Sequence, residues 1–129
     1  MKIEHIGMWC VDLEKIASFY ETYFNAIRSA RYENPVKGFS SYFLRFTNGT
    51  RLEIMHTSGV CTKENENPLC LTGFAHIAFS VGSEESVDVL TSRLEEDGYT
   101  IAGRPRRTGD GYYESVVLDP EGNSLEITI

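Results

Sequence analysis

The sequence predicts an α+β fold that consists of two similar βαβββ modules. The first observation is an internal repeat, in which HIGMWCVD at residues 5–12 matches HIAFSVGS 71 residues later, at residues 76–83. The second is that apolar residues with a spacing of three and four follow each copy, which indicates an amphipathic helix. The third is that strand-like stretches follow each helix. Because both halves have this order, we expect two modules of one kind within a single domain of 129 residues.

The first module, residues 1–56, is predicted to contain a strand, a helix and then further strands. Asp12 is a good N-cap residue for the helix. The apolar residues that follow Asp12 have helical spacing, and they are Leu13, Ile16, Phe19, Tyr20, Tyr23, Phe24 and Ile27. The stretches FSSYFLRF and TRLEIMH, residues 39–46 and 50–56, predict strands, and Asn48 and Gly49 predict the turn between them.

The second module, residues 74–129, repeats this order. Ser83 is a suitable N-cap and Gly98 a suitable end for its helix, whose apolar stripe is Val87, Leu90 and Leu94. Three strand-like stretches follow, at residues 100–104, 112–118 and 123–129, and the letters DPEG predict a turn before the last of them. The polar residues 57–73, which include one proline and two glycines, are expected to link the modules.

The composition excludes several classes of protein. A formal net charge of -7 argues against general affinity for nucleic acid phosphates, and the basic run at residues 104–107 is too short to change this. The chain has no run of about 18 apolar residues, and its start, MKIEHIGMW, lacks the apolar segment of a signal peptide. We therefore expect a cytoplasmic protein that does not bind membranes.

The three cysteines, Cys10, Cys61 and Cys70, have no CxxC spacing. This odd count predicts reduced thiols rather than a disulfide framework or a thiolate zinc site. A bridge between Cys61 and Cys70 stays open as an alternative.

Strand alternation places four polar residues on faces turned away from the helices. In the first strand, Ile6 and Met8 belong to the apolar face, which leaves His5 on the opposite one. In RLEIM, residues 51–55, the same alternation places Glu53 on the face opposite its apolar neighbours. The second module repeats both features, so the set comprises His5, Glu53, His76 and Glu126.

Two imidazoles and two carboxylates form a ligand set suited to one divalent transition metal such as Zn, Ni, Co or Mn. Four protein ligands leave open positions on a six-coordinate metal, as a catalytic metal requires. Taken singly, a strand His is more often a hydrogen-bonded structural residue, and a strand Glu usually faces water. The recurrence of the pair at matching places in both modules favours a metal site, because solvation does not require such a match.

The sequence resembles the vicinal oxygen chelate superfamily, which includes glyoxalase I, extradiol dioxygenases, methylmalonyl-CoA epimerase, and the fosfomycin and bleomycin resistance proteins. The segments HIGMWCVDLEKIASFYETYF, GFAHIAFSV and DPEGNSLEITI carry the resemblance, which extends over essentially the whole chain. It implies the glyoxalase/bleomycin resistance/dihydroxybiphenyl dioxygenase fold, in which curled mixed sheets form a cup. It also implies a homodimer, with each cup formed within one chain or shared between two subunits.

Within this superfamily the ordered set His, Glu, His, Glu resembles glyoxalase I. A dioxygenase would show His, His, Glu, epimerases typically have Gln for the first Glu, and binding-only resistance proteins often lack the ligands. The resemblance therefore implies a metal-dependent lyase or isomerase for a small oxygenated substrate, such as a 2-oxoaldehyde thiol adduct. It implies Glu126 as the catalytic proton shuttle, with Glu53 as the alternative. A ligand-sequestering resistance-type protein and an extradiol-type dioxygenase are the competing hypotheses.

One departure from glyoxalase I concerns the substrate. The bacterial enzymes commonly have an Arg four residues after the first His, where it helps to hold a glutathione carboxylate, and here that residue is Trp9. Trp9 is expected either to line the substrate cavity or to fill the cup or the interface between the modules. Cations that could replace the missing Arg are Arg51 on the face of Glu53, and Arg104, Arg106 and Arg107 in a loop before the penultimate strand. The alternative for that loop is a solvated basic segment.

Overall fold

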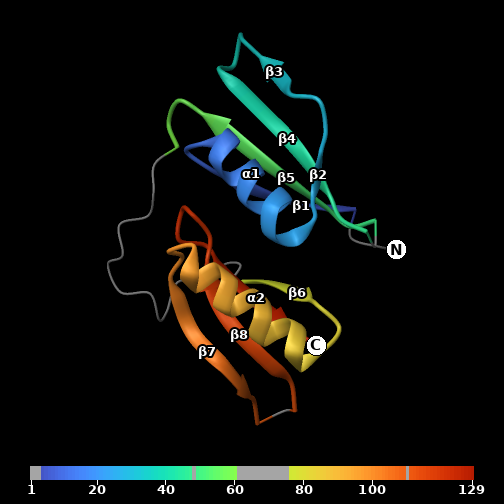
Figure 1. The fold of residues 1–129 in the computed structure, drawn as a ribbon. Coiled ribbons are helices and arrows are strands. Elements are labelled where there is room, and N and C mark those ends of the chain that lie inside the picture. The colour runs from blue at the N-terminus through green and yellow to red at the C-terminus, as the bar shows by residue number, and fades with distance from the viewer. Residues whose placement is uncertain (1–3, 48, 61–75, 110) are drawn as a thin grey trace. The chain divides into compact units, whose positions relative to one another are not determined.

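The computed structural model describes residues 4–47, 49–60, 76–109 and 111–129 (Figure 1). The chain divides into two compact units, residues 1–65 and 66–129. Most of the predicted linker, together with Cys61 and Cys70, lies outside the described residues. Cys10 is fully buried, and its thiol donates to the carbonyl oxygen of Met55 at 3.5 Å. Neither helix of the described residues is long and apolar enough to cross a membrane.

The first unit is a mixed sheet covered by one helix. Its elements in chain order are β1 (His5–Trp9), α1 (Leu13–Phe24), β2 (Ile27–Arg28), β3 (Tyr32–Asn34), β4 (Phe39–Arg45) and β5 (Arg51–Thr57). The strands are ordered β1-β5-β4-β2, and β3 also pairs with β4. β1 is parallel to β5, whereas the other pairs are antiparallel.

The second unit has the same plan. Its elements are β6 (Ile77–Ser80), α2 (Glu84–Glu96), β7 (Ile101–Arg107), β8 (Tyr113–Leu118) and β9 (Ser124–Thr128). The strands are ordered β6-β9-β8-β7, with β6 parallel to β9 and the remaining pairs antiparallel. β2 and β3 both pair with β4, as the single strand β7 pairs with β8, so each unit follows the βαβββ order. The prediction of an α+β fold with two βαβββ modules is therefore confirmed.

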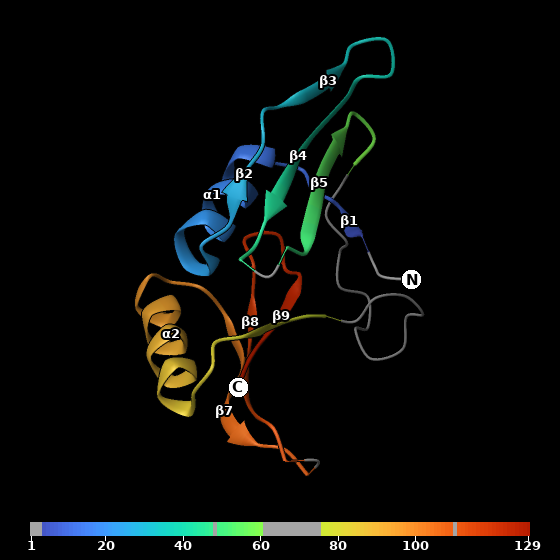
Figure 2. The same cartoon turned by 90° about the vertical axis from the view of Figure 1, so that its right-hand side faces the viewer.

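Each helix lies along one face of its own sheet (Figure 2). Apolar side chains between helix and sheet form the core of each unit, because alternation along the strands turns one set of residues toward the helix. In the first unit the largest fully buried side chains are Tyr20, Ile16, Leu44 and Ile54. In the second they are Leu94, Leu125, Ile127, Val87 and Val117.

The predicted N-caps are confirmed, but the first helix ends earlier than its apolar spacing suggests. The side chain of Asp12 accepts from the backbone N–H of Lys15 at 3.0 Å, and that of Ser83 accepts from Ser86 at 3.1 Å. Helix α1 ends at Phe24 because Asn25 has a left-handed backbone conformation with a φ of 54°. Ile27, which the spacing assigned to the helix, begins β2 instead.

Two further details differ from the prediction. The short strands β2 and β3 occupy residues for which the sequence predicted no strand. Strand β7 extends to Arg107, so Arg104, Arg106 and Arg107 lie on a strand rather than in a loop. The pairing of β7 with β8 shifts register between Gly103 and Arg106. Pro105 lies within this shift, and a proline cannot donate to a regular ladder.

The turns before β5 and β9 have the same hydrogen bonds. The N–H of Phe46 donates to Thr50 O at 3.2 Å, just as the N–H of Asp119 donates to Asn123 O at 3.0 Å. Gly49 and Gly122 close the two turns with φ values of 84° and 82°, a conformation that glycine adopts without strain. These turns set the register of β5 and β9, the strands that carry Glu53 and Glu126.

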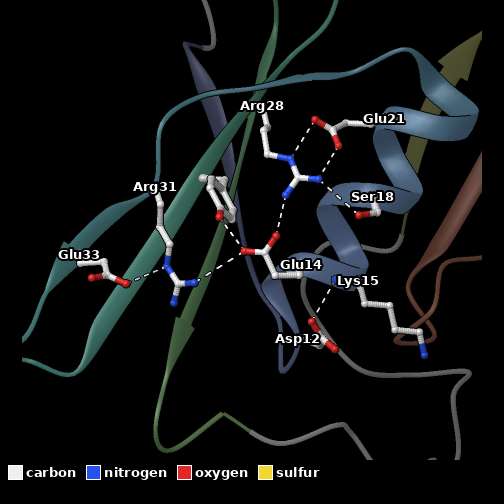
Figure 3. A network of polar contacts seen from close by, with 9 residues as sticks. Asp12, Glu14, Lys15, Ser18, Glu21, Arg28, Arg31 and Glu33 are labelled. Carbon is white, nitrogen blue, oxygen red and sulfur yellow. Dashed lines mark hydrogen bonds and ion pairs between the residues drawn. The ribbon is translucent and has the colours of Figure 1, made fainter.

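A network of charges fastens helix α1 to its sheet (Figure 3). Arg28 on β2 donates from Nε to Glu21 at 2.9 Å and from Nη1 to Glu14 at 2.7 Å. The Tyr42 hydroxyl of β4 donates to the other oxygen of Glu14 at 2.6 Å. The Tyr42 hydroxyl, and then Arg28, hold the pKa of Glu14 below its ordinary value, while Arg28 lowers the pKa of Glu21.

Arg28→Gln is expected to destabilise the protein by about 0.5–1 kcal/mol near neutral pH, because Glu14 and Glu21 are partly exposed and water screens such pairs. Carboxylates with a lowered folded-state pKa stabilise the fold above their unfolded pKa, near 4.5. This contribution is lost as the pH falls through the folded-state values. Urea unfolding at about pH 7 and about pH 3.5 should therefore show the wild-type advantage shrinking in acid.

Arg93→Gln is the matched control for this comparison, because it also removes one arginine charge next to a helix carboxylate. Arg93 Nε lies 4.0 Å from Asp97, a much looser pair. An Arg28 effect of equal size at both pH values, or no larger than the Arg93 effect, would contradict the prediction.

Candidate metal centre

The first unit brings His5 and Glu53 together. His5 begins β1 and Glu53 lies in the neighbouring parallel strand β5, where it pairs in register with Gly7. The imidazole Nε2 of His5 lies 3.7 Å from Oε2 of Glu53. The Glu53 carboxylate is largely covered, with 19% of its side chain exposed, whereas the imidazole is 40% exposed.

The second unit brings His76 and Glu126 together in the same manner. His76 directly precedes β6, and Glu126 pairs in register with Ala78 on that strand. Nε2 of His76 lies 3.2 Å from Oε2 of Glu126, with side-chain exposures of 43% and 22%. In both units the His therefore precedes the partner of the Glu by two residues, and that partner is Gly or Ala.

The small partner residues leave space beside each carboxylate. Paired residues of neighbouring strands point to the same face, so a large side chain opposite the Glu would compete with the His for that space. A Cβ added at Gly7 would lie 3.0 Å from Cε of Met55, so Gly7 makes room for the Met55 side chain on this face. The local sequence thus keeps each carboxylate accessible to its imidazole.

The distances within the two pairs suit shared coordination of a metal. Two N or O ligands that bind one ion at about 2.0–2.2 Å, with tetrahedral or octahedral angles, are about 2.8–3.6 Å apart. The His76–Glu126 distance of 3.2 Å falls within this range, and the His5–Glu53 distance of 3.7 Å lies just above it. Imidazole nitrogen with carboxylate oxygen is also a donor set that divalent transition metals accept.

Among the described residues, no group of three or more His, Cys, Asp or Glu side chains could hold a metal. The four predicted ligands are present as two pairs, one in each unit. Each pair by itself supplies two of the four ligands that the sequence predicts.

The first pair has additional partners within its own unit. Nδ1 of His5 hydrogen-bonds to the Glu4 carboxylate, which is also paired with the Arg51 guanidinium. Hydrogen bonds from His5 and then Arg51 hold the pKa of Glu4 below its ordinary value. The His5 ring also meets the Phe43 ring edge to face, with 5.4 Å between centroids, and Arg51 lies 4.3 Å over the same Phe43 ring.

Arg51, predicted to bind substrate, thus lies beside His5 and is ion-paired with Glu4. Trp9, also predicted to bind substrate, is exposed and pairs in register with Met55. Its ring meets that of Phe39 edge to face at 6.1 Å. Trp9, His5 and Glu53 share the sheet face opposite helix α1, as alternation predicts.

The remaining predicted cations are paired with carboxylates of their own unit. Arg106 lies 3.5 Å from Glu114, and Arg107 is paired with Glu84. Arg104 donates to Glu95 at 2.6 Å, which raises the pKa of the guanidinium and lowers that of the carboxyl. These contacts connect β7 to β8 and to helix α2.

The sequence prediction missed Glu4 and Phe43 as neighbours of His5. Strand alternation assigns Glu4 to the face opposite His5, and only the bend of its side chain toward His5 and Arg51 brings the groups together. The sequence did contain a signal for this contact, because acidic Glu4 precedes the candidate ligand His5 and Arg51 lies two residues before the candidate ligand Glu53.

Comparison with protein families gives a match over nearly the whole chain. Residues 2–127 match the family model described as Glyoxalase/Bleomycin resistance protein/Dioxygenase superfamily.

Individual proteins are also similar to this chain. YqjT of Bacillus subtilis (strain 168) is 28% identical over 128 residues, which cover 97% of this chain and 96% of that protein. Glutathione transferase FosA of Serratia marcescens is 38% identical over 56 residues, or 43% of this chain and 37% of that protein. The crystal structure of glyoxalase I from Zea mays matches with a TM-score of 0.80 and 21% identity, covering 98% of this chain and 44% of that one. This chain therefore spans less than half of the maize enzyme, and that likeness establishes the fold.

Proposed function

We propose that this chain, which belongs to the Glyoxalase/Bleomycin resistance protein/Dioxygenase superfamily, is a metal-dependent lyase or isomerase resembling glyoxalase I. Its substrate would be a small oxygenated molecule, such as the adduct of a 2-oxoaldehyde with a thiol. The observation that carries the proposal is the matched His–Glu pair in both units, with ligand distances of 3.7 and 3.2 Å.

Two such pairs together would hold one divalent metal ion through His5, Glu53, His76 and Glu126. Members of this family typically use a divalent metal. The metal, when bound, supplies a Lewis acid that stabilises negative charge developing on substrate oxygens. A site of four ligands requires two units, and these could belong to one chain or to two chains of a homodimer.

The role of the protein would be to move a proton between two neighbouring carbons of the substrate. We assign Glu126 as the base that removes a proton from one carbon of the adduct and returns it to the neighbouring carbon. The hydroxyl proton of the thiohemiacetal must also pass to the oxygen of the neighbouring carbon. The electron pair remains within the substrate, so the thiohemiacetal becomes a 2-hydroxy thioester without any external oxidant. Glu53, the equivalent residue of the first unit, is the alternative base.

A metal-reconstitution experiment tests this proposal. Metal-stripped protein is reloaded separately with Zn, Ni, Co or Mn and assayed with the methylglyoxal–glutathione thiohemiacetal by following thioester absorbance. We expect turnover with at least one metal and none after chelation, because the developing charge depends on the ion. Since Trp9 replaces the usual arginine, parallel assays should include other thiols.

Stoichiometric metal binding without thioester formation from any thiol would contradict the lyase assignment. Glutathione transfer is then the second candidate, favoured by the local similarity to FosA. It would be detected as loss of free thiol upon addition of an electrophilic substrate. Oxygen uptake with a catechol would instead indicate a dioxygenase.

A further inference from the structure

We propose that Glu4 and Arg51 form a positioning pair that fixes the ring orientation and the tautomer of His5. This inference rests on the proposed function, because it treats His5 as a metal ligand. The pair belongs to the first unit alone and makes the two His–Glu pairs unequal.

The hydrogen bond to Glu4 determines which nitrogen of neutral His5 carries the proton. A carboxylate can only accept, so Nδ1 of His5 must be the donor in its contact with Glu4. Nε2 is then left with its lone pair, and this is the nitrogen that lies 3.7 Å from Glu53. Hydrogen bonds of this kind orient metal-binding imidazoles in other proteins and increase their basicity as ligands.

Arg51 supports this arrangement through two contacts. Its guanidinium pairs with Glu4, and it also lies over the Phe43 ring at 4.3 Å. Phe43 in turn meets the His5 ring edge to face. Arg51 therefore contacts both Glu4 and Phe43, the two groups that contact the imidazole.

The second unit has no equivalent charges at these positions. Ala75 precedes His76 as Glu4 precedes His5, and Ser124 precedes Glu126 by two residues as Arg51 precedes Glu53. Neither Ala nor Ser can supply the ion pair. The Glu4–Arg51 pair therefore has no counterpart at the matching sequence positions of the second unit.

The tautomers of the three histidines provide the test, and they can be read by ¹H–¹⁵N correlation NMR in the metal-free protein. His56 is an internal reference, because its Nδ1 lies 3.0 Å from the carbonyl oxygen of Cys10, which also requires a proton on Nδ1. We expect wild-type His5 to show the same pattern as His56. Glu4→Ala should change the pattern of His5 and leave His56 and His76 as they were.

Zinc affinity, measured by calorimetry, is the second readout. Glu4→Ala should weaken binding by about 10–100-fold, as expected for loss of a partner to a metal-binding imidazole. Glu4→Gln retains an oxygen that can accept from Nδ1 and should restore the His5 tautomer, with a smaller loss of affinity. Arg51→Met keeps Glu4 but removes its ion pair. The zinc affinity of this variant should lie between those of Glu4→Ala and Glu4→Gln. Glu33→Ala, which removes the partner of Arg31 at 2.9 Å in the same unit, is the matched control.

The inference is overturned if wild-type His5 carries its proton on Nε2, or if Glu4→Ala leaves both the tautomer and the zinc affinity unchanged. A wild-type protein that binds no metal would count against the proposed function. The His5 tautomer in the metal-free protein would still decide whether Glu4 orients the ring, so the two failures are distinguishable.

Discussion

Glu126→Gln is expected to lower kcat by about 10²–10⁴-fold, the usual contribution of a positioned general base. Glutamine keeps a carbonyl oxygen that can bind metal, but it cannot accept a proton from carbon. Most of the metal affinity should therefore remain while turnover is lost. This separation distinguishes loss of the base from loss of the metal site.

The structure offers a matched control in Glu53→Gln. Glu53 and Glu126 occupy equivalent register positions, opposite Gly7 and Ala78, and lie at comparable distances from their imidazoles. If Glu126 is the base, the Glu53 variant should lose much less turnover at similar metal affinity. Under our assignment the base also belongs to the unit in which Ala75 and Ser124 occupy the positions of Glu4 and Arg51.

Steady-state kinetics at saturating metal, together with calorimetric metal binding, would check both variants. A Glu126→Gln enzyme with near wild-type kcat would remove Glu126 from the mechanism. If the Glu53 variant shows the larger loss, the base belongs to the first unit instead.

Because of the internal repeat, much of the fold could be predicted from the sequence. Matching N-caps and turns recur in both halves, and they set the register of β5 and β9. Once the register is set, strand alternation decides which residues share a face, and a slip of one residue would reverse it. The pairing of His5 with Glu53 and of His76 with Glu126 therefore followed from local patterns.

The features that the sequence did not reveal depend on non-local or weak signals. Helix α1 ends at Asn25 because that residue adopts a left-handed conformation, although the apolar spacing continues to Ile27. The short strands β2 and β3 are defined by pairing with β4 rather than by a pattern of their own. Glu4, which contacts His5, is also paired with Arg51, a residue distant in the sequence.

His5→Ala and His76→Ala are each expected to abolish metal-dependent turnover, because each removes one of four ligands. Metal affinity should fall by more than the roughly 10–100-fold that loss of an outer-shell partner costs. Mixing the two inactive variants then tests how the site is assembled. If each site combines the first unit of one chain with the second unit of another, a mixed dimer has one site in which all four ligands are intact.

Unfolding and refolding an equal mixture should then restore about one quarter of the wild-type activity per chain, since half of the dimers are mixed and each has one intact site of two. A mixture of His5→Ala with Glu53→Ala is the control, because both changes damage the first unit and no pairing restores it. If the His5→Ala and His76→Ala mixture stays inactive while both variants dimerise, the four ligands come from one chain. If the mixture recovers activity and chelation removes it again, each active site holds a metal ion with ligands from two subunits. Neither variant alone contains two intact His–Glu pairs.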